Sequence, residues 1–238
     1  MVQRKPYALA IMPIALITVI ISISCKDADQ SFHPDIDSEI VRLAGLSDRE
    51  VPGFIQNLDR SDVIAEYYRD PSTKREVLDF FTGITHSEKI AAAILENADR
   101  FGVPPGLAFA LAYEESKFKV AAINDNGDSV DRGLFQLNSK SFPELTEAQV
   151  YDPRENARYG LAHLEFCLRT GGNEVAALAM YNAGTTRVSR DGTPRRTLNY
   201  VFRITKYEEN ITSLFAAKVV AKDKLRVARG DRLAPAVD

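Results

Sequence analysis

Apolar residues recur every three to four positions along most of this chain, a spacing that places them on one face of an α-helix. Residues 89–101 show this pattern clearly, and Gly102 predicts the end of that helix. Pro104 and Pro105 suit the first turn of a further helix, because that turn does not use the backbone N–H that proline lacks. The pattern therefore predicts two consecutive helices, the second over about 106–118.

Further helical patterns follow, and strand signal is confined to one stretch. The expected helices are a short one near 136–141, followed by a turn at 142–144, and then 154–169, 173–182, 196–207 and 211–227. A small hairpin is expected around 126–134. Short amphipathic helices are expected between 31 and about 85, with capping-box patterns at Ser47–Glu50 and Thr73–Glu76. The fold is predicted to be mainly α, with at most a small β-hairpin and a short helical segment before the main domain.

The first 25 residues differ from the rest. Arg4 and Lys5 precede an apolar run from Ala8 to Ser24, which is short for the roughly 20 residues of a membrane-spanning helix and fits an export signal better. Cys25 follows small and aliphatic residues and resembles the lipidation site of bacterial lipoproteins, which implies a lipid anchor on Cys25 and a periplasmic, outer-membrane location. Ser22 stands where such sites usually carry Leu, so an exported protein without an anchor is the alternative.

These patterns divide the chain into four parts. We expect a lipoprotein-type signal at 1–25, a tether and helical segment at 26–84, a main domain at 85–210, and a C-terminal helix and tail at 211–238. The net charge is −3, with 30 Lys plus Arg against 33 Asp plus Glu, so the chain has no basic footprint for nucleic acid. Nucleic acid is therefore not an expected partner.

Metal and thiol chemistry find little support in the sequence. Cys167 lies among leucines at helical spacing and is expected to be buried and unreactive. The three histidines are scattered and fit no metal-ligand pattern; they are His33, His86 and His163. We expect no metal and no cofactor.

Two adjacent carboxylates, Glu114 and Glu115, end the apolar helix. Burial disfavours the charged form of a carboxyl group and raises its pKa, so a buried glutamic acid can stay protonated near neutral pH and donate that proton to a leaving oxygen. Both residues have apolar neighbours at helical offsets, so periodicity does not choose between them. Two solvated acids at a helix end are the other interpretation.

Four motifs occur in order after this point: ESKF at Glu115–Phe118, GLFQLN at Gly133–Asn138, ALAMYNAGTTRV at Ala177–Val188, and PRRTLNYV at Pro194–Val201. The series resembles the transglycosylase SLT domain family of lytic transglycosylases. The resemblance covers about residues 85–207 and implies a lysozyme-like α+β domain without a cofactor. It places the catalytic acid on Glu115.

The resemblance also implies a reaction and a set of contacts. Family members cleave the β-1,4 bond between N-acetylmuramic acid (MurNAc) and N-acetylglucosamine (GlcNAc) in peptidoglycan, and one glutamate acts first as acid and then as base to leave a 1,6-anhydro product. Substrate contacts are expected from Ser116 and Gln136 by hydrogen bonding, from Tyr181 and Asn182 near the acid or the sugar, and from Tyr200 and Phe135 as flat apolar faces.

The loop NDNGDSVDRGLFQLN is longer and more acidic than the family usually shows. Its acids, Asp125, Asp128 and Asp131, can each supply the second carboxylate of a lysozyme-type muramidase that hydrolyses the same bond. A calcium loop is disfavoured because Ala122 and Gly133 occupy the two positions that most need an acid. A non-catalytic lipoprotein that binds peptidoglycan, or a scaffold for an envelope machine, is the alternative from another class.

Overall fold

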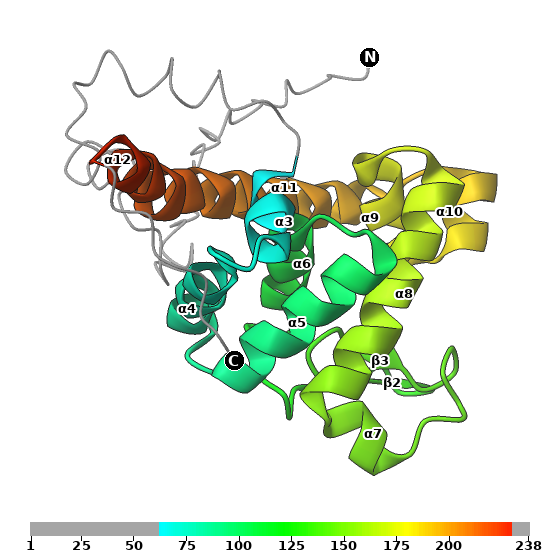
Figure 1. The fold of residues 1–238 in the computed structure, drawn as a ribbon. Coiled ribbons are helices and arrows are strands. Elements are labelled where there is room, and N and C mark those ends of the chain that lie inside the picture. The colour runs from blue at the N-terminus through cyan, green and yellow to red at the C-terminus, as the bar shows by residue number, and fades with distance from the viewer. Residues whose placement is uncertain (1–61, 230–238) are drawn as a thin grey trace, which may run out of the picture. The chain divides into compact units, whose positions relative to one another are not determined.

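The computed structural model describes residues 62–229 (Figure 1). The expected signal segment, Cys25, the tether and the predicted helix start at Ser47 all lie outside this range. None of the helices within 62–229 has the length and apolar character needed to cross a bilayer.

Helices dominate the described chain, and one small sheet interrupts them. The first helices are α3 (Val63–Arg69), α4 (Lys74–Thr85), α5 (Glu88–Phe101) and α6 (Pro105–Ser116). The strands are β1 (Ile123–Asp125), β2 (Val130–Arg132) and β3 (Leu137–Asn138). The remaining elements are α7 (Glu147–Tyr151), α8 (Pro153–Gly171), α9 (Glu174–Ala183), α10 (Thr185–Asp191), α11 (Arg195–Phe215), the π-helical turn η1 (Ala216–Val220) and α12 (Ala221–Arg229). The predicted mainly α fold is confirmed. The strands form a three-stranded antiparallel sheet in the order β1-β2-β3, in which β1 and β2 make the expected hairpin and β3 is an additional strand.

Helix α6 is the centre of the core. All of its residues from Leu107 to Ala112 are fully buried, as expected for a helix that is apolar on every side. It packs against α5 and α11, and the three helices can be followed in Figure 1. A helix buried in this way brings whatever polar groups stand at its end to the edge of the core.

The helices that precede residue 85 belong to the same core. Ile64 and Tyr68 of α3 and Val77 and Phe81 of α4 are buried in it, and the Phe81 ring stacks on Phe109 of α6 with centroids 3.8 Å apart. The C-terminal end returns to the same region, since the Tyr67 hydroxyl donates to Asp223 at 3.2 Å.

The predicted end of one helix at Gly102 and the predicted start of the next near Pro105 agree with the structure. Several other local predictions are wrong. Gly102 adopts a left-handed conformation with φ 64° after α5, and Pro105 is the first residue of α6. The Thr73 hydroxyl does not cap α4; it donates to the Tyr67 carbonyl oxygen at 2.7 Å. Residues 136–141 form β3 and turns instead of a helix, because β3 pairs with β2 at Arg132 and Leu137.

Two further differences concern helix number. The predicted break between 207 and 211 is absent, because α11 continues from Arg195 to Phe215. Ile204, Ile211 and Phe215 are buried on one face of it, so the polar residues between them lie outside the core without interrupting the helix. Helix α7, which has a capping box between Thr146 and Gln149, and helix α10 were not predicted.

Gly160 should tolerate no side chain, whereas Gly83 should. A Cβ at Gly160 in α8 would lie 2.4 Å from the Cβ of the fully buried Phe135, while a Cβ at Gly83 in α4 would meet nothing within 4 Å. Gly160→Ala is expected to lower the free energy of unfolding by about 1–3 kcal/mol through overpacking. Gly83→Ala is expected to raise it by about 0.5–1 kcal/mol, since glycine is costly in a helix.

Urea unfolding of both variants beside the parent protein measures these changes. A Gly160→Ala midpoint equal to or above that of the parent would contradict the close approach of α8 to Phe135.

Candidate functional site

Glu115 lies in the last turn of α6, where the chain leaves the core. Lys117 and Phe118, the two residues after the helix, both have positive φ, 53° and 60°. Such a conformation is unfavourable for residues with a side chain. The Phe118 ring is nevertheless buried against Phe109 and Tyr113, and this packing offsets the cost. The tight turn ends α6 at Ser116, one residue after Glu115, and leads the chain towards the sheet.

Tyr200 on α11 holds the carboxyl group of Glu115. Its hydroxyl donates a hydrogen bond to Glu115 Oε1. Burial raises the pKa of Glu115 from its ordinary 4.5 to about 7; the hydrogen bond from Tyr200 lowers it, and the charges of Glu114 and Asp131 raise it. Glu115 can therefore both give and accept a proton near neutral pH.

Glu114 has a different environment, although it is the next residue. Its Oε1 accepts from Arg203 Nε at 2.9 Å, and Lys117 Nζ lies 3.7 Å from Oε2. Tyr200 and Arg203 stand three residues apart on α11, so one face of this helix pairs a tyrosine with Glu115 and a cation with Glu114. Helical periodicity did not separate the two acids, whereas α11 gives them different partners.

Tyr181 on α9 comes close to the same carboxyl group. Its hydroxyl donates to the Phe135 carbonyl oxygen at 2.9 Å. Its pKa is raised well above the ordinary value, mainly by burial and also by the charge of Glu115. This electrostatic effect shows that the phenol and the carboxyl group share one environment. Asn182, the next residue, has an exposed side chain whose Oδ1 accepts from the Thr197 hydroxyl at 3.0 Å and so links α9 to α11.

Two of the expected substrate contacts instead make hydrogen bonds within the protein. The Ser116 hydroxyl is buried and donates to the Ala112 carbonyl oxygen at 3.0 Å. Gln136 has φ 47°, and its Nε2 donates to the carbonyl oxygens of Gly133 at 2.9 Å and Ala122 at 3.3 Å. These bonds hold the turn before β3 against the start of the sheet. Their contact with a sugar stays a prediction.

The expected role of Phe135 as an apolar platform for a sugar is wrong. Its ring is fully buried and packs on Gly160. Tyr200 is only 6% exposed, and it holds Glu115 instead of offering a ring face to solvent. The apolar side chains of GLFQLN are all buried, namely Leu134, Phe135 and Leu137, whereas Gln136 and Asn138 are partly exposed.

The loop acids have separate partners. Asp125 accepts from the Gly127 backbone N–H at 2.8 Å, and Asp128 pairs with Lys140. Asp131 accepts from Asn138 Nδ2 at 2.7 Å and from Asn126 Nδ2 at 2.8 Å. Only Asp131 among these three affects the pKa of Glu115. Within residues 62–229, no group of three or more His, Cys, Asp and Glu side chains is arranged to hold a metal ion.

Arg203 and Asn156 were not singled out from the sequence. Asn156 on α8 is 1% exposed; it accepts from the Phe135 backbone N–H at 2.8 Å and donates to the Val150 carbonyl oxygen at 2.8 Å. It thereby fixes the segment that carries Gln136. A polar residue on the apolar face of α8 was the available signal for Asn156. Arg203 gave none, because its partner lies 89 residues away in the sequence.

A mainly helical domain, with an acid at the end of a buried helix and a small antiparallel sheet directly after it, has the lysozyme-like architecture. Residues 92–200 match the family model described as Transglycosylase SLT domain, so this part of the chain is similar to that family. The matched residues include the four sequence motifs except for Val201, the last residue of the fourth. The match confirms the resemblance drawn from these motifs.

The chain is also similar to the invasion protein IagB from two strains of Salmonella typhimurium. The identity is 33% over 99 residues, which cover 39% of this chain and 62% of the relative. This chain therefore aligns with less than two thirds of the length of these relatives.

Replacing Tyr200 should raise the pKa of Glu115 further. The Tyr200 hydroxyl stabilises the ionised carboxylate, so Tyr200→Phe removes a contact that favours the charged form. An NMR titration of the Glu115 carboxyl carbon measures the change. Tyr207→Phe is the control, because Tyr207 stacks on Tyr113 and does not bond to Glu115. A lower pKa in Tyr200→Phe would contradict the bond.

Glu115 should also make the stability of the protein depend on pH. Its pKa is about 7 in the folded state against an ordinary 4.5, so the folded protein holds a proton that the unfolded chain has released. Its contribution to stability is complete below about pH 4.5 and is lost as the pH rises through 7. Glutamine has no titratable carboxyl group, so the Glu115→Gln variant has no such pH-dependent contribution to lose. The stability of this variant relative to the parent should therefore rise with pH, by up to about 3 kcal/mol.

Urea unfolding at several pH values between 4 and 8 measures this difference. Glu114→Gln serves as the control, since Glu114 is paired with Arg203. A difference between Glu115→Gln and the parent that stays constant with pH would contradict the raised pKa.

Proposed function

We propose that this protein is a lytic transglycosylase that cleaves the β-1,4 bond from MurNAc to GlcNAc in peptidoglycan and leaves 1,6-anhydroMurNAc ends. The match to the Transglycosylase SLT domain supports the class of reaction. The observation that carries the proposal is the partly buried Glu115, whose pKa is raised to about 7 and whose carboxyl group is held by Tyr200.

In the first step, protonated Glu115 donates its proton to the glycosidic oxygen as the bond from that oxygen to the MurNAc anomeric carbon breaks. The leaving sugar departs with a free hydroxyl group, and Glu115 becomes a carboxylate. In the second step, this carboxylate takes the proton of the MurNAc 6-hydroxyl as the oxygen of that hydroxyl bonds to the anomeric carbon. The acid is restored, and no water is consumed.

Tyr200 and Arg203 suit this cycle for different reasons. The hydrogen bond from Tyr200 fixes Glu115 Oε1 and stabilises the carboxylate that exists between the two steps. Arg203 is paired with Glu114, so this neighbouring carboxylate has its own counter-charge. Glu115 then has a pKa between those of a free acid and a fully desolvated one, which suits a group that must both donate and accept.

Hydrolysis by two carboxylates is the competing mechanism, with Asp131 as the second group. Both Asp131 oxygens accept hydrogen bonds from side-chain amides, one from Asn138 and one from Asn126. These bonds favour a role in holding β1, β2 and β3 together over a role as a nucleophile or base. This observation supports the single-carboxylate mechanism.

We also propose that the protein is exported and anchored to the outer membrane through a lipid on Cys25, with the domain facing the periplasm. The support is the charged and apolar segment before Cys25 in the sequence.

The test combines two variants with the mass of the product. The parent protein, Glu115→Gln and Glu114→Gln are incubated with purified peptidoglycan, and the released fragments are analysed by mass spectrometry. Glu115→Gln should lose activity by about 10²–10⁴-fold, whereas Glu114→Gln should stay within a few-fold of the parent. The parent rate should fall as the pH rises above about 7, because Glu115 loses its proton there.

The product of the parent should be lighter by one water than a hydrolysed fragment. A fragment that contains the added water would sink the lytic mechanism and favour a muramidase. Full activity in Glu115→Gln would remove Glu115 as the catalyst. Binding to peptidoglycan without release of fragments would favour the non-catalytic alternative.

A further inference from the structure

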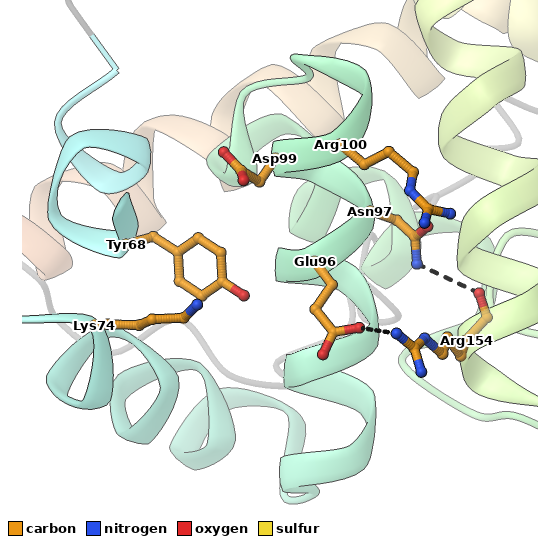
Figure 2. A pocket seen from close by; sticks show the side chains of 7 residues that line it. All are labelled: Tyr68, Lys74, Glu96, Asn97, Asp99, Arg100 and Arg154. Atoms are coloured by element: carbon orange, nitrogen blue, oxygen red, sulfur yellow. Dashed lines mark hydrogen bonds and ion pairs between the residues drawn. The ribbon is translucent and has the colours of Figure 1, made fainter. Parts of the chain in front are cut away.

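A pocket of about 270 Å³ lies apart from Glu115, between α3, α4, α5 and the start of α8. Its lining is Tyr68, Lys74, Glu96, Asn97, Asp99, Arg100 and Arg154. Figure 2 shows Tyr68 and Lys74 on one side of α5 and Arg154 on the other, with Glu96 between them. None of the residues expected to contact the glycan lines it.

The acids that line this pocket already have cationic partners. Arg154 Nη2 lies 3.0 Å from Glu96 Oε2. Arg69 Nε lies 2.6 Å from Asp99 Oδ1. The negative charges of the lining are therefore balanced within the protein.

Two cations and one hydroxyl group in the pocket have no such partner within residues 62–229. Within residues 62–229, neither Lys74 nor Arg100 forms an ion pair; the Lys74 ammonium lies 4.7 Å from the centre of the Tyr68 ring. Tyr68 is only 7% exposed, and its hydroxyl has no hydrogen-bond partner in the same part of the chain. Figure 2 shows this hydroxyl directed towards the space beside Glu96. Among the described residues, Thr82 Oγ1 is the one buried side-chain polar atom that lacks a partner, so the Tyr68 hydroxyl is open to the solvent of the pocket.

We propose that this pocket binds the carboxylates of a short peptide. Lys74 and the Tyr68 hydroxyl receive one carboxylate on their side of α5, and Arg100, which lies on the same side of α5 as Arg154, supplies positive charge for another. A carboxylate accepts up to about four hydrogen bonds, so each side can hold one. The pocket has room for more than a single small anion.

The source of such a peptide follows if the proposed function is correct. Peptidoglycan carries short peptides on MurNAc, and these peptides end in carboxylates and contain amino groups. A second contact on the same substrate raises the effective concentration of the glycan near Glu115 without a change in the chemistry. The pocket should therefore affect the KM for glycan that carries its peptides and leave kcat unchanged.

The direct test is binding of a free tripeptide, L-Ala-γ-D-Glu-meso-diaminopimelate, to the full chain, measured by calorimetry. Lys74→Met and Arg100→Gln remove the charges, and Tyr68→Phe removes only the hydroxyl. Each should weaken binding by about ten- to a hundredfold, as expected for loss of a hydrogen bond to a charged group. The same peptide with its terminal carboxylates amidated should bind more weakly than the free acid.

Arg75→Gln is the matched control. Arg75 follows Lys74 on α4, is similarly exposed, and pairs with Asp79 and Glu88 outside the pocket. Its substitution should leave tripeptide binding unchanged. Glu115→Gln should also bind the tripeptide like the parent, so loss of the proposed catalysis and loss of the pocket give different results.

A second measurement distinguishes a free peptide from one attached to the glycan. Binding to glycan strands is compared before and after an amidase removes their peptides, in the inactive Glu115→Gln background. If only the intact strands bind, and Lys74→Met weakens that binding, the result would support the pocket with the attached peptide as its ligand. The proposal would be overturned if neither the tripeptide nor the intact glycan strands bind. It would also be overturned if Lys74→Met and Arg100→Gln bind these probes as tightly as Arg75→Gln does.

Discussion

The site depends on the hydrogen bond from Tyr200 to Glu115, which joins α11 to the end of α6. A carboxyl group that loses its water gains proton affinity, and an unsupported one simply stays neutral. The bond from Tyr200 opposes this effect, so the pKa of Glu115 lies near 7. The balance requires both helices at a fixed separation, and the packing of the fully buried α6 against α11 maintains it.

The same pair of helices gives two neighbouring acids opposite properties. Arg203 is one turn beyond Tyr200 on α11, and it pairs with Glu114. The tight turn at Lys117 and Phe118 is equally necessary, because one further helical turn would displace the strands and the loop acids from the end of α6.

The sheet and α8 form a support for this arrangement. Asn156 holds the Gly133–Gln136 turn, and Asp131 gathers amides from the hairpin and from β3. Phe135 and Gln136 illustrate the limit of motif reasoning. Their positions in GLFQLN suggested contacts with a sugar, yet the Phe135 ring fills the space left by Gly160, and the Gln136 amide bonds to backbone carbonyl groups. Part of a conspicuous motif can therefore serve the packing and geometry of a site.

The sequence by itself determined the mainly helical fold, the end of α5 at Gly102, the start of α6 at Pro105, and the two candidate acids. These features depend on contacts within a few residues, where apolar spacing and the conformations of glycine and proline act directly. Helix α11 was divided wrongly because its buried face is defined by partners outside the helix. Only the tertiary structure decided that Glu115 meets Tyr200 and that Phe135 is buried. Those outcomes depend on groups that lie 85 residues apart for the acid, and no local pattern specifies which distant side chain will stand opposite.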